Sequence, residues 1–469
     1  MIRIFSQYVS VKSLLLMLLE SLVIALSLVC GVKLRFWNEP GEFEFYTMLP
    51  DFGAQALIVI VIFQVCFYYN DLYDLSAVRR RSEQLIRLCQ SLGAACLLLG
   101  FLYLWAPALL IVRGVFFITM VVSITSIMVT RAALEGAWQV TASPDNVLIL
   151  GTGELAITLA RELSKRDDLN LRLAGFVASK DADFPPGGQL FGHPVVGSAK
   201  DLERLTIEHR VSRIVVAMED SRGSLPVRDL VKLRVEGIEV EDVHSAIAAL
   251  TGRVWLGTVR PSWFVFSQGF RRSGLIIVLK RTVDLCFGLV GLVLSAPVML
   301  LVAIAIRLDS RGPILYRQER VGLRGRRFWV LKFRSMRVDA EEGEKAQWAQ
   351  QDDPRATPLG KFIRKVRLDE LPQFLNVLRG EMSFVGPRPE RPVFVDMLRE
   401  KIPYYDERHS VRPGVTGWAQ VQYPYGASVE DAYRKLEYDL FYLQNMSALF
   451  DCAIVFQTVR IVLFGRGGR

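Results

Sequence analysis

Residues 285–306 form the apolar run LCFGLVGLVLSAPVMLLVAIAI, which holds no charge over 22 residues. As a helix it would be about 33 Å long, enough to cross a bilayer core of ~30 Å. Basic residues lie on both sides, up to Arg281 before it and from Arg307 after it, so the run lacks the charge asymmetry of a spanning helix. Pro297 lies within the run and favours a break. We expect a re-entrant helix over residues 282–306, with a fifth membrane span as the alternative.

Four further apolar runs lie ahead of it, and each is near the ~20 residues that a spanning helix needs. They occupy residues 14–32, 54–69, 88–105 and 115–129. We expect a four-helix transmembrane domain at residues 1–135, in which Glu20 faces other helices or water. The second loop holds an arginine cluster: Arg79, Arg80, Arg81 and Arg87. The positive-inside bias then places the N-terminus and everything after Arg131 in the cytoplasm. A cleaved signal peptide is the alternative for the first run, but no clear cleavage site follows it.

The composition agrees with membrane segments attached to soluble domains. The chain of 469 residues is 51% apolar and 22% charged, which excludes a disordered chain, a collagen-like repeat or a small disulfide scaffold. Its six cysteines include no C-x-x-C pair, so the sequence predicts no zinc site. The net charge of +9 would suit nucleic acid, an anionic membrane or phosphorylated substrates. Because the basic residues lie beside the membrane-proximal runs, we expect no nucleic acid partner.

Residues 140–250 alternate strand-like with helix-like runs. The strand candidates are residues 146–150, 171–177, 213–218 and 237–243, and the helix candidates are 199–210 and 226–235. This pattern predicts a Rossmann-like parallel α/β domain. Gly151 and Gly153 begin a G-x-G-x-x-A turn that could hold a nucleotide phosphate at a helix N-terminus. No acidic residue ends the second strand at the expected spacing, since Asp181 comes late. The alternative is a nucleotide-binding fold kept as a structural or regulatory module.

The C-terminal segment carries the densest chemistry, around the adjacent carboxylates of Asp369 and Glu370. Arg364 and Arg367 precede this pair, and Arg388 follows it. Neighbouring carboxylates are costly to ionise together without cations or a divalent metal. Two acids among several cations suit phosphoryl transfer, in which one carboxylate attacks phosphorus and the cations hold phosphate oxygens. The alternative for an Asp-Glu pair is a solvated helix start.

Four motifs in this segment are specific together: KFRSM at 332–336, LDELPQ at 368–373, FVGPRPE at 384–390 and RPGVTGWAQV at 412–421. Residues 275–469 resemble the bacterial sugar transferase family, the monotopic polyprenyl-phosphate phosphoglycosyl transferases. With four N-terminal spans and a Rossmann-like middle domain, the whole chain resembles the long form of that family. The N-terminal RIFSQYVSVKSLLL at residues 3–16 is similar to the subset associated with exosortase-linked exopolysaccharide clusters.

The resemblance implies a reaction in which UDP-sugar and undecaprenyl phosphate give undecaprenyl-diphospho-sugar and UMP. Asp369 matches the nucleophile that forms an aspartyl-phosphosugar intermediate, and Glu370 matches its partner, associated with Mg²⁺. The resemblance places substrate and phosphate binding at Lys332, Arg334, Arg364, Arg388 and Glu390. It also places the break of the re-entrant helix at Ser295 and Pro297, which Ala296 separates in this sequence.

The expected fold is therefore a membrane protein of α plus α/β class, in four parts. These are a transmembrane domain at 1–135, a Rossmann-like domain at 140–250, a linker at 251–274 and an α-rich transferase domain at 275–469. We expect it in a bacterial inner membrane, as a homodimer by analogy, with the middle and catalytic domains cytoplasmic and an interfacial or core helix at 447–464. One alternative is an inactive polysaccharide-export scaffold or sensor. A membrane-bound nucleotide-sugar dehydratase is disfavoured because the only Tyr-x-x-x-Lys, at Tyr8, precedes the first span.

Overall fold

The computed structural model divides into two compact units, Met1–Ala246 and Ile247–Arg469. It describes residues 2–4, 6–49, 51–74, 81–107, 111, 113–141, 144–178, 188–218, 225–258, 263–264, 267, 269–270, 273–337, 355–423, 426 and 428–464. The predictions that concern Arg79, Arg80 and Asp181 therefore lie outside the described residues.

The first unit begins with a short antiparallel hairpin, β1 (Ile2–Ile4) and β2 (Gln7–Val9), followed by the membrane-type helices. The four predicted runs form long apolar helices: α1 (Val11–Arg35), α3 (Phe52–Tyr69), α4 (Arg81–Trp105) and α5 (Arg113–Thr141). A short helix, α2 (Pro40–Met48), follows α1 and was not predicted. Among the described residues, five helices are long and apolar enough to cross a membrane: these four and α11 of the second unit.

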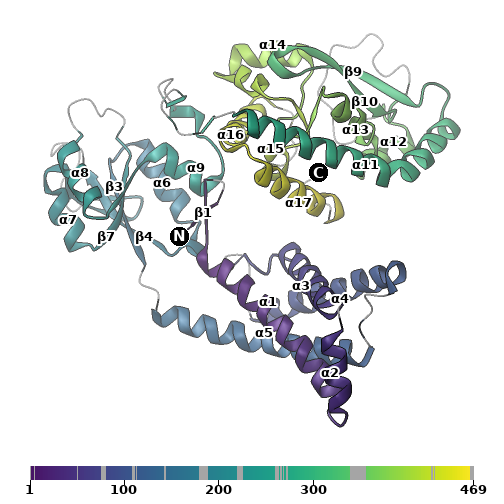
Figure 1. Ribbon diagram of the computed structural model, residues 1–469. Coiled ribbons are helices and arrows are strands. Elements are labelled where there is room, and N and C mark those ends of the chain that lie inside the picture. Colours follow the sequence, from purple (N-terminus) through teal and green to yellow (C-terminus); the bar gives the residue numbers. More distant parts are fainter. Residues whose placement is uncertain are drawn as a thin grey trace. The chain divides into compact units, whose positions relative to one another are not determined.

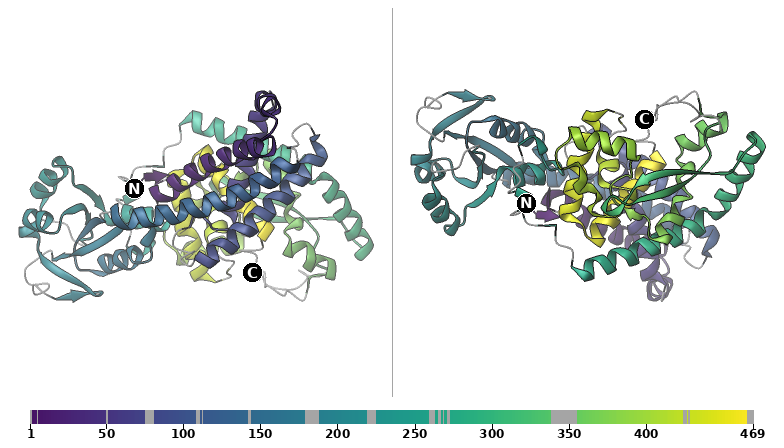
Figure 2. Two further views of the ribbon diagram at one scale, coloured as in Figure 1. Left: turned by 90° about the horizontal axis from the view of Figure 1, so that it is seen from below. Right: turned by 90° about the horizontal axis from the view of Figure 1, so that it is seen from above.

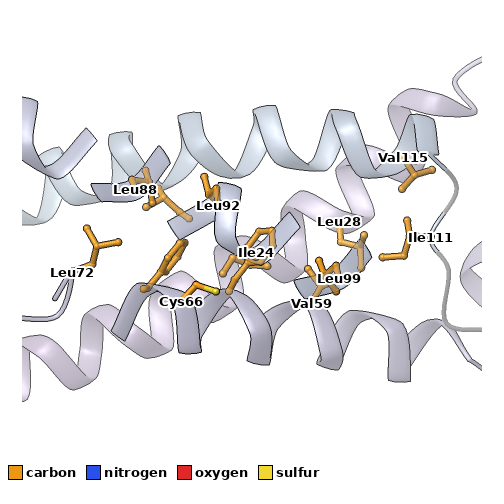
Figure 3. Close-up of a cluster of buried hydrophobic side chains, with 14 of the residues drawn as sticks. Ile24, Leu28, Val59, Cys66, Leu72, Leu88, Leu92, Leu99, Ile111 and Val115 are labelled. Carbon is orange, nitrogen blue, oxygen red and sulfur yellow. The ribbon is translucent and has the colours of Figure 1, made fainter. Parts of the chain in front are cut away.

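The four long helices of the first unit share one apolar core, built around side chains such as Ile24, Phe63, Leu92 and Val115. Figure 3 shows the labelled side chains of this core pointing toward one another from all four helices. Helices α1 and α5 run side by side in Figures 1 and 2.

An ion pair joins α1 and α5, because Arg131 Nε lies 2.6 Å from Oε1 of Glu20. The Tyr73 hydroxyl donates to the other oxygen of Glu20 at 2.7 Å. Glu20 is fully buried, so the prediction that it faces other helices is confirmed.

The α/β region of the first unit is a six-stranded sheet in the order β5-β6-β4-β3-β7-β8. Its strands are β3 (Asp145–Leu150), β4 (Leu171–Ala178), β5 (Gln189–Leu190), β6 (His193–Ser198), β7 (Val211–Val216) and β8 (Glu239–Asp242). All pair in parallel except β5, which is antiparallel to β6. The parallel sheet was predicted, whereas β5 and β6 were not. Helices α6 (Glu154–Leu163), α7 (Leu202–Glu208) and α8 (Val227–Val235) belong to the same region (Figure 1).

The second unit begins with the end of α9 (Val243–Thr251) and contains the longest helix of the described chain, α11 (Gly274–Asp309). Secondary structure is continuous through Pro297, but Figure 1 shows α11 changing direction along its length. The Ser295 hydroxyl donates to the Gly291 carbonyl at 2.6 Å. Such a bond to the preceding turn, together with a proline, is a known cause of helix bending.

The rest of the second unit packs around two small sheets. Strands β9 (Leu315–Val321) and β10 (Arg327–Phe333) form an antiparallel hairpin, while β11 (Ser383–Val385) pairs in parallel with β12 (Gly414–Thr416). The helices are α12 (Pro358–Lys365), α13 (Gln373–Arg379), α14 (Pro392–Lys401), α15 (Trp418–Gln422), α16 (Val429–Asn445) and α17 (Ala448–Phe464). The predicted C-terminal helix is α17, and it buries Asp451 while leaving Leu449 exposed.

Part of the expected linker is packed against this unit. The Trp418 indole donates to the Gly252 carbonyl at 2.7 Å, and the Val254 amide donates to the Glu437 carbonyl at 3.0 Å. The Glu437 carboxylate, which is fully buried, accepts from the Leu256 amide and pairs with Arg253. Residues 252–256 therefore bind both α15 and α16. We call this segment the strap.

Candidate active site

The acidic pair lies on a single 3₁₀ turn, η6 (Leu368–Glu370), between α12 and α13. Arg367 begins this turn in the left-handed region, with φ 57° and ψ 21°. The Glu370 amide donates back to the Arg367 carbonyl at 3.2 Å. A left-handed residue other than glycine is uncommon and costs conformational energy. Arg367 therefore turns the chain sharply, so that both carboxyl groups project from the same short turn.

Glu370 is held by two cations. Arg388 Nη2 donates to Oε1 of Glu370 at 2.5 Å, and Lys332 Nζ donates to the same oxygen at 3.3 Å. Burial raises the pKa of Glu370, but Arg388 and Lys332 outweigh this effect and lower the pKa below its usual value. Glu370 is therefore ionised across the physiological range.

Asp369 lies in a different environment although it is the next residue. Only 8% of it is exposed, and its carboxyl group accepts no hydrogen bond from the described residues. Burial, reinforced by the neighbouring charge of Glu370, raises its pKa to about 6. Lys332, Arg388 and Arg364 oppose this rise. The guanidinium of Arg364 makes no hydrogen bond or ion pair with the described residues, so it is available to an anion beside Asp369.

Lys332 reaches the pair from β10, and burial lowers the pKa of its ammonium group. The position of β10 is fixed by Asn376 of α13, which is fully buried. Its Oδ1 accepts from the Leu331 amide at 3.0 Å, and its Nδ2 donates to the Trp329 carbonyl at 2.8 Å. The helix that follows the acidic pair therefore also sets the position of the lysine that binds it.

Arg388 follows β11, and its loop is braced by a buried ion pair. Arg408 Nη2 donates to the Arg388 carbonyl at 3.0 Å and to Oδ2 of Asp439 at 2.9 Å. The Arg408 Nη1 donates to the Tyr405 hydroxyl at 2.7 Å. Arg408 and Asp439 are 6% and 1% exposed. They act on the site indirectly, by fixing the backbone that carries Arg388.

The structure brings together most of the predicted site residues, with two qualifications. Arg334 does not point to the acidic pair, because its guanidinium donates to the carbonyls of Ser310 and Arg311 at 2.8 and 3.0 Å. Glu390 binds a cation, with Oε2 3.4 Å from Nη1 of Arg320. A carboxylate in this setting is suited to holding an arginine.

Ser295 and Pro297 lie in the middle of α11, as described above. Gly151 and Gly153 belong to the other unit, at the start of α6. Gly151 has φ +133°, and a Cβ there would lie 2.5 Å from the Ala217 carbonyl oxygen. The close approach of β3 and β7 is therefore enough to require this glycine.

Sequence reasoning missed four residues that build the site: Arg320, Asn376, Arg408 and Asp439. Asn376 follows the LDELPQ motif by three residues, and Arg408 precedes Arg412 of the RPGVTGWAQV motif by four. Their nearness to the motifs was the only available signal. The Arg408–Asp439 pair joins residues 31 positions apart, which no local pattern reveals.

The acidic pair could contribute to a metal site only with help from other ligands. No group of three or more His, Cys, Asp or Glu side chains with metal-binding geometry occurs among the described residues. Asp369 and the second oxygen of Glu370 are hard oxygen donors of the kind that Mg²⁺ prefers. These two carboxylates could hold a Mg²⁺ ion, which would need further ligands beyond the described residues.

The site is a carboxylate pair set among partly buried cations, in the same compact unit as the long apolar helix α11. The chain belongs to the bacterial sugar transferase family, which matches residues 276–465, and residues 69–241 match a CoA-binding domain. The UDP-glucose:undecaprenyl-phosphate glucose-1-phosphate transferase of Klebsiella pneumoniae is 31% identical over 415 residues, 86% of this chain and 87% of that protein.

Two other relatives are similar over shorter regions. The UDP-N-acetylgalactosamine-undecaprenyl-phosphate N-acetylgalactosaminephosphotransferase of Aeromonas hydrophila is 42% identical over 242 residues, 52% of this chain. The undecaprenyl-phosphate glucose phosphotransferase of Komagataeibacter xylinus is 34% identical over 328 residues, 68% of this chain. The matches span only 56% and 59% of the length of these two relatives.

Proposed function

We propose that this protein transfers a sugar-1-phosphate from a UDP-sugar to undecaprenyl phosphate, releasing UMP. The observation that carries the proposal is the division of roles within the acidic pair. Glu370 is neutralised by Arg388 and Lys332, which leaves Asp369 without a hydrogen-bonding partner among the described residues and next to the unpaired Arg364. The names of the relatives, which are undecaprenyl-phosphate sugar phosphotransferases, support the same substrates.

The proposed reaction has two displacements at one phosphorus atom. First, an Asp369 oxygen attacks the sugar-bearing phosphorus of UDP-sugar, and the bond from this phosphorus to the bridging oxygen breaks, so that UMP leaves with the electron pair. Second, an oxygen of undecaprenyl phosphate attacks the same phosphorus, which breaks the aspartyl–phosphorus bond and regenerates the carboxylate. Arg364 and Arg388 hold the phosphate oxygens. When bound, Mg²⁺ would neutralise charge that develops on these oxygens.

We propose that α11 enters the bilayer and returns to the same face. Near its start, Lys280 Nζ donates to Asp451 at 2.7 Å and to the Val385 carbonyl at 2.9 Å. Just beyond its end, the Ser310 carbonyl is bound by Arg334 of the same compact unit. A straight helix of this length would be about 54 Å long, whereas α11 contains Pro297 and changes direction along its length in Figure 1. Between its two ends the helix exposes apolar side chains, including 74% of Leu294.

This topology would place Asp369 at the cytoplasmic surface of a bacterial inner membrane, where soluble UDP-sugar and lipid-anchored undecaprenyl phosphate meet. The product would be the first lipid-linked intermediate of an exopolysaccharide or O-antigen repeat unit. Single cysteines at Leu275 and Leu308, which are exposed, would test the topology in a cysteine-replaced background. Both should react with an impermeant maleimide from the same side of the membrane. Labelling from opposite sides would establish a fifth span.

The reaction is tested by UMP release in nanodiscs with Mg²⁺ and undecaprenyl phosphate, across UDP-glucose, UDP-galactose and UDP-N-acetylgalactosamine. UMP formation that depends on the lipid phosphate is the expected result. Release of UDP would mean direct glycosyl transfer and would contradict the role of Asp369. Folded protein that releases neither nucleotide would favour an inactive scaffold or sensor.

A further inference from the structure

Arg320 lies on the face of the β9–β10 hairpin that is turned toward the acidic pair. The antiparallel register places Tyr316 opposite Lys332 and Arg320 opposite Phe328. Because side chains alternate along a strand, Arg320 shares its face of the hairpin with Lys332. Arg327 lies on the other face, with 61% of its side chain exposed. The hairpin therefore points one arginine at the site and another at solvent.

Contacts at both terminal nitrogens hold the guanidinium of Arg320 in place. Its Nη1 donates to the Pro389 carbonyl at 3.1 Å and lies 3.4 Å from the Glu390 carboxylate. Its Nη2 donates to Oε1 of Gln318 at 2.6 Å. The Val321 amide, next along the strand, donates to the Glu390 carbonyl at 3.0 Å. Arg320 is thereby fixed to the same loop that carries Arg388.

Positive charge is concentrated in this part of the site. Burial lowers the pKa of Arg320, and the charges of Arg388 and Arg391 lower it further, while Glu390 opposes them. Lys332 and Arg388 already share the single carboxylate oxygen of Glu370. Grouping partly buried cations in this way is unfavourable unless an anion joins them. Such an arrangement is typical of a site that binds a multiply charged ligand.

The order of Asp369, Arg388 and Arg320 along the site matches the order of the two phosphates in a nucleoside diphosphate sugar. Arg388 donates to Glu370, the neighbour of Asp369, and Arg320 donates to the carbonyl of Pro389, the residue after Arg388. The loop that carries Arg388 therefore links the acidic pair to Arg320. A phosphate attacked by Asp369 would face Arg388, and the next phosphate along would face Arg320.

We propose that Arg320 binds the α-phosphate of the UDP-sugar, which is the phosphate of the departing UMP. This assignment rests on the proposed function. As the bond between the bridging oxygen and the sugar-bearing phosphorus breaks, negative charge develops on the bridging oxygen and the α-phosphate. The planar guanidinium of Arg320 can donate two parallel hydrogen bonds to phosphate oxygens, an arrangement that a lysine ammonium does not reproduce.

The experiment compares the binding of UMP and of uridine, which differ only by the phosphate. Inhibition constants for both would be measured on the full-length protein in nanodiscs, for the wild type, Arg320→Ala, Arg320→Lys and the control Arg327→Ala. We expect wild type and Arg327→Ala to bind UMP more tightly than uridine. Arg320→Ala should lose about 10- to 100-fold in UMP affinity, with no change for uridine. Arg320→Lys should lose several-fold.

Three outcomes would overturn parts of the assignment. If Arg320→Ala keeps the wild-type ratio of UMP to uridine affinity, Arg320 does not bind the phosphate. If uridine weakens as much as UMP, the arginine only holds the hairpin in place. If Arg320→Ala does not fold by gel filtration, Arg320→Lys decides, and an unchanged ratio there would overturn the proposal. A wild-type protein that releases no UMP from any UDP-sugar would instead contradict the proposed function itself.

Discussion

Glu370 and Asp369 are adjacent in the chain, yet among the described residues only Glu370 accepts hydrogen bonds from the surrounding cations. Its Oε1 accepts from Arg388 at 2.5 Å and from Lys332 at 3.3 Å, whereas the Asp369 carboxyl group accepts none from the described residues. The cations therefore stabilise the charge of Glu370, and the ionised Glu370 disfavours ionisation of Asp369. This difference gives the pair one permanent anion and one carboxylate that is free to attack phosphorus.

Asp369→Asn should abolish UMP release without destabilising the protein. An amide is too weak a nucleophile, so we expect turnover to fall by at least about a thousandfold. The raised pKa of Asp369 means that its ionised form opposes folding at neutral pH, by at most about 3 kcal/mol. The melting temperature should therefore stay the same or rise. Asp396→Asn, at an exposed position on α14, is the matched control and should retain turnover.

The rate of the first displacement should fall as the pH is lowered through about 6. Asp369 must be ionised to attack, and its pKa is raised to about 6, so the protonated form predominates below that pH. We expect kcat/KM for UDP-sugar to drop toward a tenfold loss per pH unit below this point. The free energy of unfolding should instead rise as the pH is lowered, because the folded state binds the Asp369 proton more tightly than the unfolded chain does. A rate that is flat between pH 5 and 8 would mean that Asp369 is not the titrating nucleophile.

Magnesium should bind together with the nucleotide rather than to the free protein. The described residues offer no cluster of three metal-binding side chains, so we expect water and phosphate oxygens to complete the coordination. We expect EDTA to stop UMP release without changing the melting temperature. The apparent affinity for Mg²⁺ should rise with UDP-sugar concentration. Full turnover in EDTA would show that the arginines and Lys332 suffice without a metal.

Removing Arg408 should destabilise the unit that carries the site. Arg408→Ala leaves Asp439 buried without its cation, a change that costs about 3–5 kcal/mol. The melting temperature should fall by roughly 10 °C. Arg399→Ala removes an exposed arginine that pairs with Asp406, and it should change stability by less than about 1 kcal/mol. Equal melting temperatures for the two variants would show that the buried pair contributes little.

The strap should loosen when its indole hydrogen bond is removed. Trp418→Phe keeps the aromatic ring but deprives the Gly252 carbonyl of its donor, at a cost of about 1 kcal/mol. Trypsin cleavage after Arg253, which lies in the strap, should become about fivefold faster. Trp329→Phe is the control, because Trp329 is exposed on the hairpin. Unchanged cleavage in Trp418→Phe would mean that Glu437 alone holds the strap.

The length of the apolar runs and the spacing of apolar residues predicted the long membrane-type helices and the buried strands. The long apolar runs became α1, α3, α4, α5 and α11, and β-branched runs became the strands of the parallel sheet. The acidic pair and Arg388 were predictable because their residue types already suggest the chemistry. Short elements such as α2 and β5 carry too few residues for either signal.

The direction of side chains was much harder to predict. Lys332 and Arg334 differ by two positions, yet one binds Glu370 and the other binds the carbonyls that follow α11. Arg320 lies 49 residues before Asp369 in the chain, and only the register of the β9–β10 hairpin shows which face it occupies. Tertiary packing decides such positions, and it leaves no local trace in the sequence.

The Glu20–Arg131 pair has a consequence for how the chain is made. The two residues are 111 positions apart, so at 5–20 residues per second the arginine is synthesised about 6–22 s after the glutamate. During that interval the first helix carries a carboxylate without its cation, which is costly within a bilayer. We therefore expect α1 to settle in the membrane only when α5 arrives. The insertion machinery would release the two helices as a pair, and not one after the other.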